Sequence, residues 1–170
     1  MASPYSYPLL LDADKGKKLH WGVYNRIMGF EEISHTADWS VRVWAQDLPS
    51  LFAEAARAMN SLAGTVLDAS PRLKQTFESD APDVESLLVA FLSELVYYQE
   101  QENLAFDVFK LEVKSAALTG EAVPKGQKLK VEMEGAQIAS IDKAIKAVTY
   151  HNLKIERTNE GFETTIVFDV

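Results

Sequence analysis

The sequence predicts an α+β fold, a two-layer sandwich in which two helices pack on a mixed β-sheet. The chain has 170 residues, of which 47% are apolar, so it can bury one sizeable hydrophobic core. Its hydrophobic patterns follow the order strand, helix, strand, helix and then several strands, without an internal repeat. A chain organised in this way covers one face of a sheet with its helices.

The first strand and helix are predicted between residues 39 and 63. Two sets of residues alternate over 39–45, which is the period of a strand. Asp47 and Pro49 then signal the start of a helix, and Gly64 signals its end. Apolar side chains recur at helical spacing between these signals, so we expect a helix over 49–63.

A second strand and helix follow the same order. Leu73 and Phe77 are the apolar members of a short strand predicted over 71–80. Pro82 stands among residues that start helices, and a broad apolar stripe follows it. We therefore predict a helix over 82–101.

The remainder of the chain has the patterns of strands. The apolar face switches between Val108 and Phe109, which indicates a bulge in a strand over 106–113. Residues 129–133 form the next alternating stretch. Two longer strands are predicted over 145–155 and 162–170, and Asn159 to Gly161 supply the hairpin turn that joins them.

The charge of the chain limits its partners. It carries 17 basic and 25 acidic side chains, a formal net charge of -8. Direct binding to RNA or DNA is not expected, because it would need a basic patch working against this field. A protein partner or a cation fits better.

The absence of cysteine and the short apolar runs bear on where the protein is located in the cell. Cysteine is absent, which excludes disulfides and cysteine metal sites, and a cytoplasmic location is the simpler expectation. The apolar run 9–11 is too short for a signal sequence or a membrane span. We therefore expect no membrane partner.

His35 and Asp38 form the first candidate site. They lie three residues apart, directly before the strand predicted over 39–45. A histidine and an aspartate at the mouth of a strand can converge on one divalent ion or anchor a turn. Capping of a turn by Asp38 is the alternative.

Asp169 and Val170 form the second candidate site. If Phe168 and Val170 face the core, Asp169 faces the other way. Its side chain and the carboxylate of Val170 would then form a dense group of oxygen ligands, which suits calcium, magnesium or manganese. A frayed polar end is the alternative.

Lys146 and His151 are the third pair of candidates. They lie on opposite faces of the strand predicted over 145–155. If Ile145 faces the core, His151 is half-buried and Lys146 is exposed. An ordinary core histidine and a solvated lysine are the plainer interpretations.

Taken together, these stretches resemble the archease family. The similarity lies in the run from Gly29 to Asp38, in the helical segments 51–59 and 87–95, in the run from Lys146 to Leu153 and in the ending 168–170. It covers about residues 28–170, in the family's order, so these form a single archease-like domain. Residues 1–27 depart from the family pattern and show no helical or strand period, and we expect them to be a poorly ordered N-terminal extension.

The resemblance implies an accessory role beside the RtcB-type RNA ligase, which joins RNA ends in tRNA splicing and RNA repair through a guanylate on its own histidine. Archease-like proteins speed the guanylylation step and allow repeated turnover, by bringing a metal-bearing acidic tip to the ligase. The implied tip residues are Asp38, Asp169 and Val170, and the contact or supporting residues are Lys146, His35 and His151. The chain is then not itself an enzyme. Adjacent first and last strands would bring Asp38 and Asp169 together, which we predict.

Two other functions stay open. The first is a metal-dependent phosphoester hydrolase that uses His35, Asp38 and Asp169. The second is a chaperone-like binding module without a metal, which the broad apolar helix and the acidic surface would allow.

Overall fold

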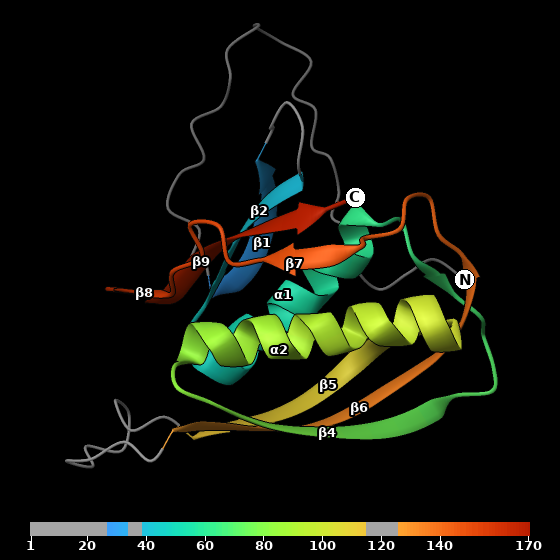
Figure 1. Ribbon diagram of the computed structural model, residues 1–170, viewed down its shortest axis with the longest axis horizontal. Helices are drawn as coiled ribbons and strands as arrows, with labels where there is room; N and C mark the ends of the chain where they lie inside the picture. The colour runs from blue at the N-terminus through green and yellow to red at the C-terminus, as the bar shows by residue number, and fades with distance from the viewer. Residues whose placement is uncertain (1–26, 34–38, 115–125) are drawn as a thin grey trace, which may run out of the picture.

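Two antiparallel sheets enclose a layer of two helices in the computed structural model (Figure 1). The structure describes residues 27–33, 39–114 and 126–170. The elements are β1 (Met28–Ile33), β2 (Trp39–Ala45), α1 (Leu48–Leu62), β3 (Val66–Leu67), β4 (Leu73–Ala81), α2 (Val84–Tyr97), the π-helical turn η1 (Tyr98–Glu102), β5 (Leu104–Lys114), β6 (Gln127–Ser140), β7 (Ala147–Thr149), β8 (Glu156–Thr158) and β9 (Gly161–Asp169).

Both helices begin within two residues of their predicted starts, α1 at Leu48 instead of 49 and α2 at Val84 instead of 82. The Asp47 side chain accepts a hydrogen bond of 2.7 Å from the Ser50 amide, and Asp83 accepts one of the same length from Ser86. These N-caps satisfy amides that the first turn of a helix leaves free. Asn103 ends η1 with a left-handed backbone, at a φ of 53°.

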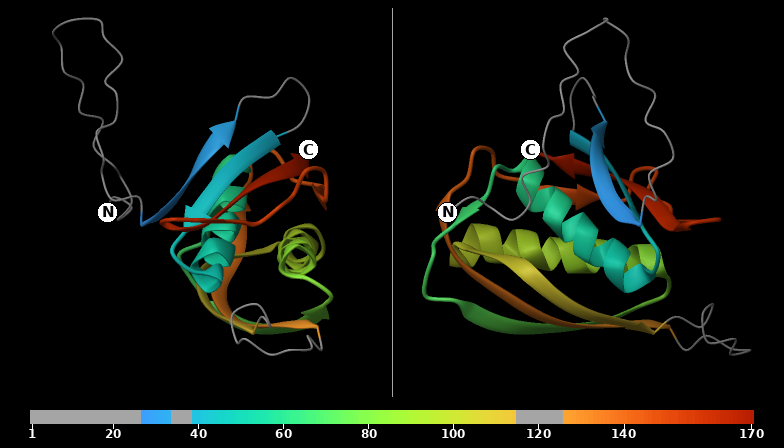
Figure 2. Two further views of the ribbon diagram at one scale, coloured as in Figure 1. Left: turned by 90° about the vertical axis from the view of Figure 1, so that its left-hand side faces the viewer. Right: turned by 180° about the vertical axis from the view of Figure 1, so that it is seen from behind.

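The helices contact both sheets. One sheet has the order β1-β2-β9-β7, with β8 also paired to β9, and in the other β6 pairs with β3, β4 and β5. Helix α1 packs against β2 and β5, and α2 packs against β4 and β7. The view turned by 90° shows the helices between the two sheets (Figure 2). The apolar core therefore lies between the helices and each of the two sheets. Phe52 of α1 and Phe91 of α2 are both fully buried in it.

The predicted α+β class and the two helices are confirmed. The structure differs from the predicted single mixed sheet in that the described strands form two sheets with antiparallel pairs throughout. Strand β1 was not predicted, because its sequence MGFEEI lacks regular alternation. Among the described helices, none is both long enough and apolar enough to cross a membrane.

The predicted long strand over 145–155 is wrong. The chain forms β7, turns, and resumes as β8. Asn152, in the turn, has a φ of 53°, which belongs to the left-handed region and not to a strand. Val148 faces the core instead of Ala147, because its cross-strand partner is the buried Phe168.

The predicted bulge in β5 is present. The register against β6 shifts between Phe106 and Val108, one position before the predicted switch. Asp107, the bulged residue, is exposed, and the core-facing side chains resume at Phe109.

Candidate functional site

Three strands meet at one end of the first sheet. Trp39, the first residue of β2, pairs with Phe168 near the end of β9. Ala147, the first residue of β7, pairs with Asp169. The backbone amide of Lys146 donates a hydrogen bond of 2.8 Å to the Asp169 carbonyl. We call the surface formed by Trp39, Lys143, Lys146, Asp169 and Val170 the C-terminal tip.

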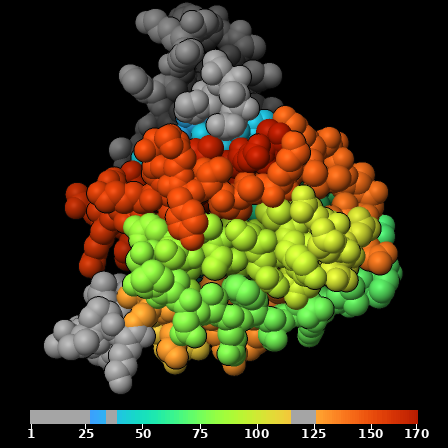
Figure 3. Space-filling view, viewed as in Figure 1, coloured from blue at the N-terminus to red at the C-terminus, as the bar shows by residue number. Residues whose placement is uncertain are grey.

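The alternation of β9 presents Asp169 to solvent. Phe168 is fully buried and Val170 packs partly against the core, whereas Asp169 between them is exposed. This confirms the predicted orientation of the last three residues, which follows from the period of two in a strand. The space-filling view shows the C-terminal atoms, in dark red, open at the surface beside orange atoms (Figure 3).

The segment 141–146 approaches the tip from the end of α1. The amides of Asp142 and Lys143 both donate to the Ala63 carbonyl, over 2.9 and 3.2 Å. Ile145 is 1% exposed and fixes the segment to the core. The Lys143 ammonium lies over the Trp39 ring, 5.0 Å from its centroid. The segment is thus attached to α1, the core and β9.

The structure brings some predicted site residues together and separates others. Lys146 and Asp169 are neighbours and both are exposed, as predicted for Lys146. His35 and Asp38 lie outside the described residues, so the predicted adjacency of Asp38 and Asp169 stays a prediction. Within the described residues, no group of three or more histidine, aspartate or glutamate side chains could hold a metal ion.

His151 is not the half-buried residue predicted from a long strand. It is exposed, in the turn after β7, and its ring Nε2 lies 3.0 Å from the Asn152 amide nitrogen. Strand β7 leads away from the tip, because Ala147 pairs with Asp169 but Thr149 already pairs with Val167. His151 therefore follows the end of β7 that points away from the tip.

Sequence reasoning did not predict the contact between Lys143 and Trp39. The contact between them joins residues that are far apart in the chain, and no local spacing indicates it. The cue available in the sequence was a second lysine three positions before Lys146.

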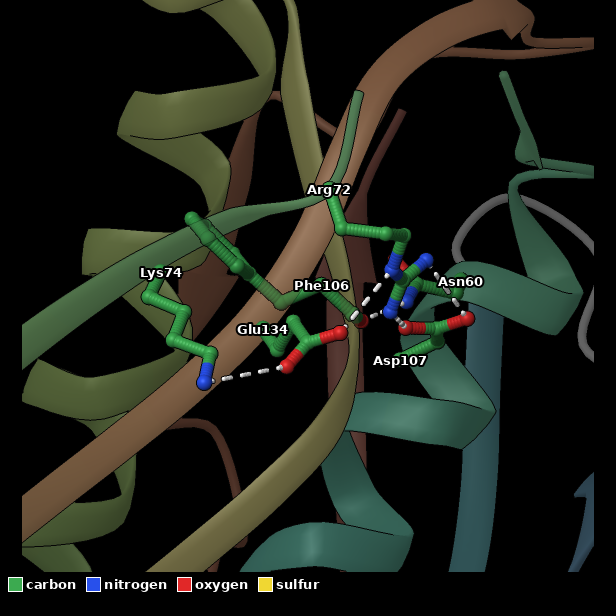
Figure 4. A network of polar contacts seen from close by, with 6 residues as sticks. All are labelled: Asn60, Arg72, Lys74, Phe106, Asp107 and Glu134. Atoms are coloured by element: carbon green, nitrogen blue, oxygen red, sulfur yellow. Dashed lines mark hydrogen bonds and ion pairs between the residues drawn. The ribbon is translucent and has the colours of Figure 1, made fainter. Parts of the chain in front are cut away.

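A second polar cluster lies at the bulge in β5 (Figure 4). Arg72 hydrogen-bonds to both carboxylate oxygens of Asp107 and, over 3.2 Å, to Glu134. The hydrogen bond with Asp107 raises the pKa of Arg72 above its ordinary value. Asn60 donates to the Phe106 carbonyl over 2.7 Å. Arg72 is paired with carboxylates of the cluster, and Asn60 is hydrogen-bonded to the backbone at the bulge. These contacts indicate that the cluster stabilises the bulge.

Comparison with known proteins gives a consistent result. Residues 30–170 match the model of the Archease protein family. The protein archease of Pyrococcus furiosus is 32% identical over 136 residues, covering 78% of this chain and 91% of that protein. The protein archease of Methanopyrus kandleri is 32% identical over 146 residues, covering 84% of this chain and all of that protein (100%).

Two solved structures share the fold. Protein 1598 of Methanobacterium thermoautotrophicum aligns with a TM-score of 0.60 at 23% identity, covering 84% of this chain and 99% of that one. A Thermotoga maritima protein described as an archease and possible chaperone aligns with a TM-score of 0.57 at 24% identity, covering 82% and 96%.

Proposed function

The chain belongs to the archease family, and on this premise we propose that it is an accessory protein of an RtcB-type RNA ligase. In this role it promotes guanylylation and repeated turnover of a ligase that acts in tRNA splicing and RNA repair. The C-terminal tip is the part of the molecule that we propose to enter the ligase active site.

The observation that carries the proposal is the register between β2 and β9. Trp39 directly follows Asp38 in the chain, and Phe168 directly precedes Asp169, and Trp39 and Phe168 are paired. This pairing supports a tip on which Asp38 and Asp169 act together. It explains how two acidic residues at opposite ends of the domain's sequence could serve one site.

The proposed ligands fit a hard divalent cation. Calcium, manganese and magnesium prefer oxygen donors, and Asp169 offers an exposed carboxylate at the tip. The described side chains alone are too few for a site, so the proposed set is Asp38, Asp169 and the carboxylate of Val170. When bound, the ion would supply positive charge near the triphosphate during guanylyl transfer.

The protein side chains themselves need only bind and orient. The exposed Asp169 carboxylate is a ligand in this proposal and not a nucleophile. The backbone of Lys146 is bonded to the Asp169 carbonyl and its side chain is exposed, so we propose that its positive charge favours an anion in this region. An accessory protein of this kind needs no catalytic residue of its own.

The test is the guanylylation rate of an RtcB-type ligase with GTP and manganese, with and without this chain. We expect the wild-type chain to accelerate the step and the variant Asp38→Asn with Asp169→Asn to lose most of the acceleration. Asp80→Asn is the matched control, because Asp80 is an exposed aspartate on β4 in the other sheet. Circular dichroism would verify that each variant is folded.

The alternatives predict different outcomes. If the variant without both carboxylates accelerates the ligase as well as the wild type, a metal-independent chaperone-like function replaces the acidic tip. If the purified chain alone cleaves phosphoesters, it is a metal-dependent hydrolase. No effect of the wild-type chain on the ligase would refute the accessory role.

A further inference from the structure

The lysines of the described part of the chain divide into two groups. Those that pair with a carboxylate, over 3.2 to 3.8 Å, are Lys74, Lys110, Lys114, Lys128, Lys130 and Lys154. Lys143 and Lys146, the remaining two, form no ion pair with any described residue. Both belong to the C-terminal tip, although the chain as a whole has a net charge of -8 and carries many carboxylates.

The surroundings of Lys143 orient its ammonium without neutralising it. Its contact is the face of Trp39, at 5.0 Å from the ring centroid. A cation above an aromatic ring is attracted by the ring quadrupole but keeps its full charge. Trp39 is itself fixed, since it is paired with Phe168 and packs against the core. The charge of Lys143 is therefore held in place and left available.

The backbone holds the two lysines in one short segment. The Lys143 amide is bonded to the end of α1, and the Lys146 amide is bonded to Asp169. Ile145, between them, is buried. Since both ends of the segment are attached, its backbone is fixed, and the two exposed lysines extend from one short stretch of chain only three positions apart.

We propose that Lys143, positioned by Trp39, binds phosphate groups of the nucleoside triphosphate in the ligase active site. The proposal rests on the accessory function proposed above, which brings the tip to that triphosphate. A triphosphate carries several charges along a short chain, which matches two cations on one segment, and lysine binds phosphate as a point charge. Lys143 is the binding residue, and Trp39 is a positioning residue.

The first test is a titration of GTP in the ligase guanylylation assay at saturating accessory protein. Lys143→Gln should raise the KM for GTP roughly tenfold, the loss expected for one charge-assisted contact, with the maximal rate changed less than about twofold. Lys143→Arg should restore the KM, because a guanidinium also stacks on tryptophan. Lys154→Gln is the matched control, since Lys154 is an exposed lysine paired with Glu156.

The positioning role of Trp39 has its own readout. Trp39→Leu removes the ring but keeps an apolar side chain at the same strand position, and should raise the KM for GTP as Lys143→Gln does. Trp39→Phe keeps an aromatic face and should raise it less. Equal KM values for Trp39→Leu and the wild type would refute the positioning role.

The second test uses the isolated full chain with inorganic tripolyphosphate. Addition of tripolyphosphate should shift the NMR signal of the Trp39 indole N–H in the wild type, assigned with Trp39→Phe. The shift should be lost in Lys143→Gln and kept in Lys154→Gln. This readout does not depend on the ligase.

The two tests separate failure of this inference from failure of the proposed function. If the wild type accelerates the ligase but Lys143→Gln leaves the KM for GTP unchanged, the inference is overturned and the accessory function stands. If Lys143→Gln changes only the concentration of accessory protein needed for half-maximal acceleration, Lys143 contacts an acidic surface of the ligase, and the inference is overturned. If the wild type does not affect the ligase, the accessory function fails, and the tripolyphosphate titration then tests the phosphate site by itself. A shift of the Trp39 signal that requires Lys143 supports a phosphate site at Lys143. No shift overturns that site.

Discussion

Gly64 and Asp142 lie in direct contact where α1 ends: a Cβ atom added to Gly64 would lie 2.2 Å from a carboxylate oxygen of Asp142. Gly64 has a φ of 62°, and its amide donates to the Ser61 carbonyl while the Thr65 amide donates to Asn60. This is the Schellman ending of a helix, in which glycine takes the left-handed position. Lys143, which directly follows Asp142 in the chain, belongs to the C-terminal tip.

Gly64→Ala should lower the free energy of unfolding by about 1 kcal/mol, because a Cβ atom strains the left-handed backbone. It should also shift the NMR signals of segment 141–146, since the Asp142 side chain must move aside. Urea denaturation measures the first effect. Gly64→Ala made in an Asp142→Ala background is the control, because the side chain that the added Cβ atom would meet is then absent and only the backbone strain remains. A loss that disappears in this background would contradict the role given to φ.

Gly135 of β6 has a different constraint. A Cβ atom there would lie 1.9 Å from the Ala105 carbonyl oxygen on the neighbouring strand, beside the bulge at Asp107. Backbone atoms cannot move aside as a flexible side chain can, so Gly135→Ala should destabilise the protein by roughly 2–3 kcal/mol. Urea denaturation at neutral pH measures the loss.

Gln137→Ala is the matched control for this strand, because Gln137 is exposed on β6 two positions further on. It should change the free energy of unfolding by less than about 0.5 kcal/mol. If Gly135→Ala were as mild as this control, the close approach of β5 and β6 at the bulge would be refuted.

The helices could be predicted because their signals are local. The caps Asp47 and Asp83 directly precede the helices, and the apolar stripes lie within them, so the prediction of 49–63 differs from α1, Leu48–Leu62, by one residue at each end. The division into two sheets could not be predicted in this way, because it depends on pairings such as Trp39 with Phe168, far apart in the chain.

Only part of the candidate site could be predicted, because only part of it depends on local sequence. The exposure of Asp169 follows from alternation along one strand. The exposure of His151 could not be predicted in this way. The apolar and polar residues of the sequence go on alternating through this stretch, but the chain turns there, with Asn152 in the left-handed region. The contact of Lys143 with Trp39 depends on the whole fold.

Tyr98 should make stability depend on alkaline pH. Burial raises the pKa of Tyr98, and the Glu94 carboxylate raises it further. The folded protein thus favours the neutral phenol, whereas in the unfolded chain the phenol ionises near pH 10. The stabilisation is present below about pH 10 and is lost as the pH rises through the folded pKa, so Tyr98→Phe should flatten the decline in stability there.

Urea denaturation from pH 8 to 11 measures this effect. Tyr97→Phe is the control, because Tyr97 is the neighbouring tyrosine and its side chain is 50% exposed. The same alkaline decline in Tyr98→Phe and in the wild type would show that the Tyr98 phenol does not control it.

Removal of divalent ions should lower the stability of the wild-type chain if the acidic tip binds them. An ion that binds only the folded state stabilises it by about 2.7 kcal/mol at a concentration of 100 Kd. Thermal unfolding in EDTA, and then with calcium or manganese added back, measures the difference in Tm. Asp169→Asn should abolish the metal-dependent rise in Tm, because it removes the exposed carboxylate at the tip. Asp80→Asn should keep the rise, since Asp80 lies on β4 and pairs with Lys128. A rise that persists undiminished in Asp169→Asn would place the ion elsewhere and remove the metal from the proposed function.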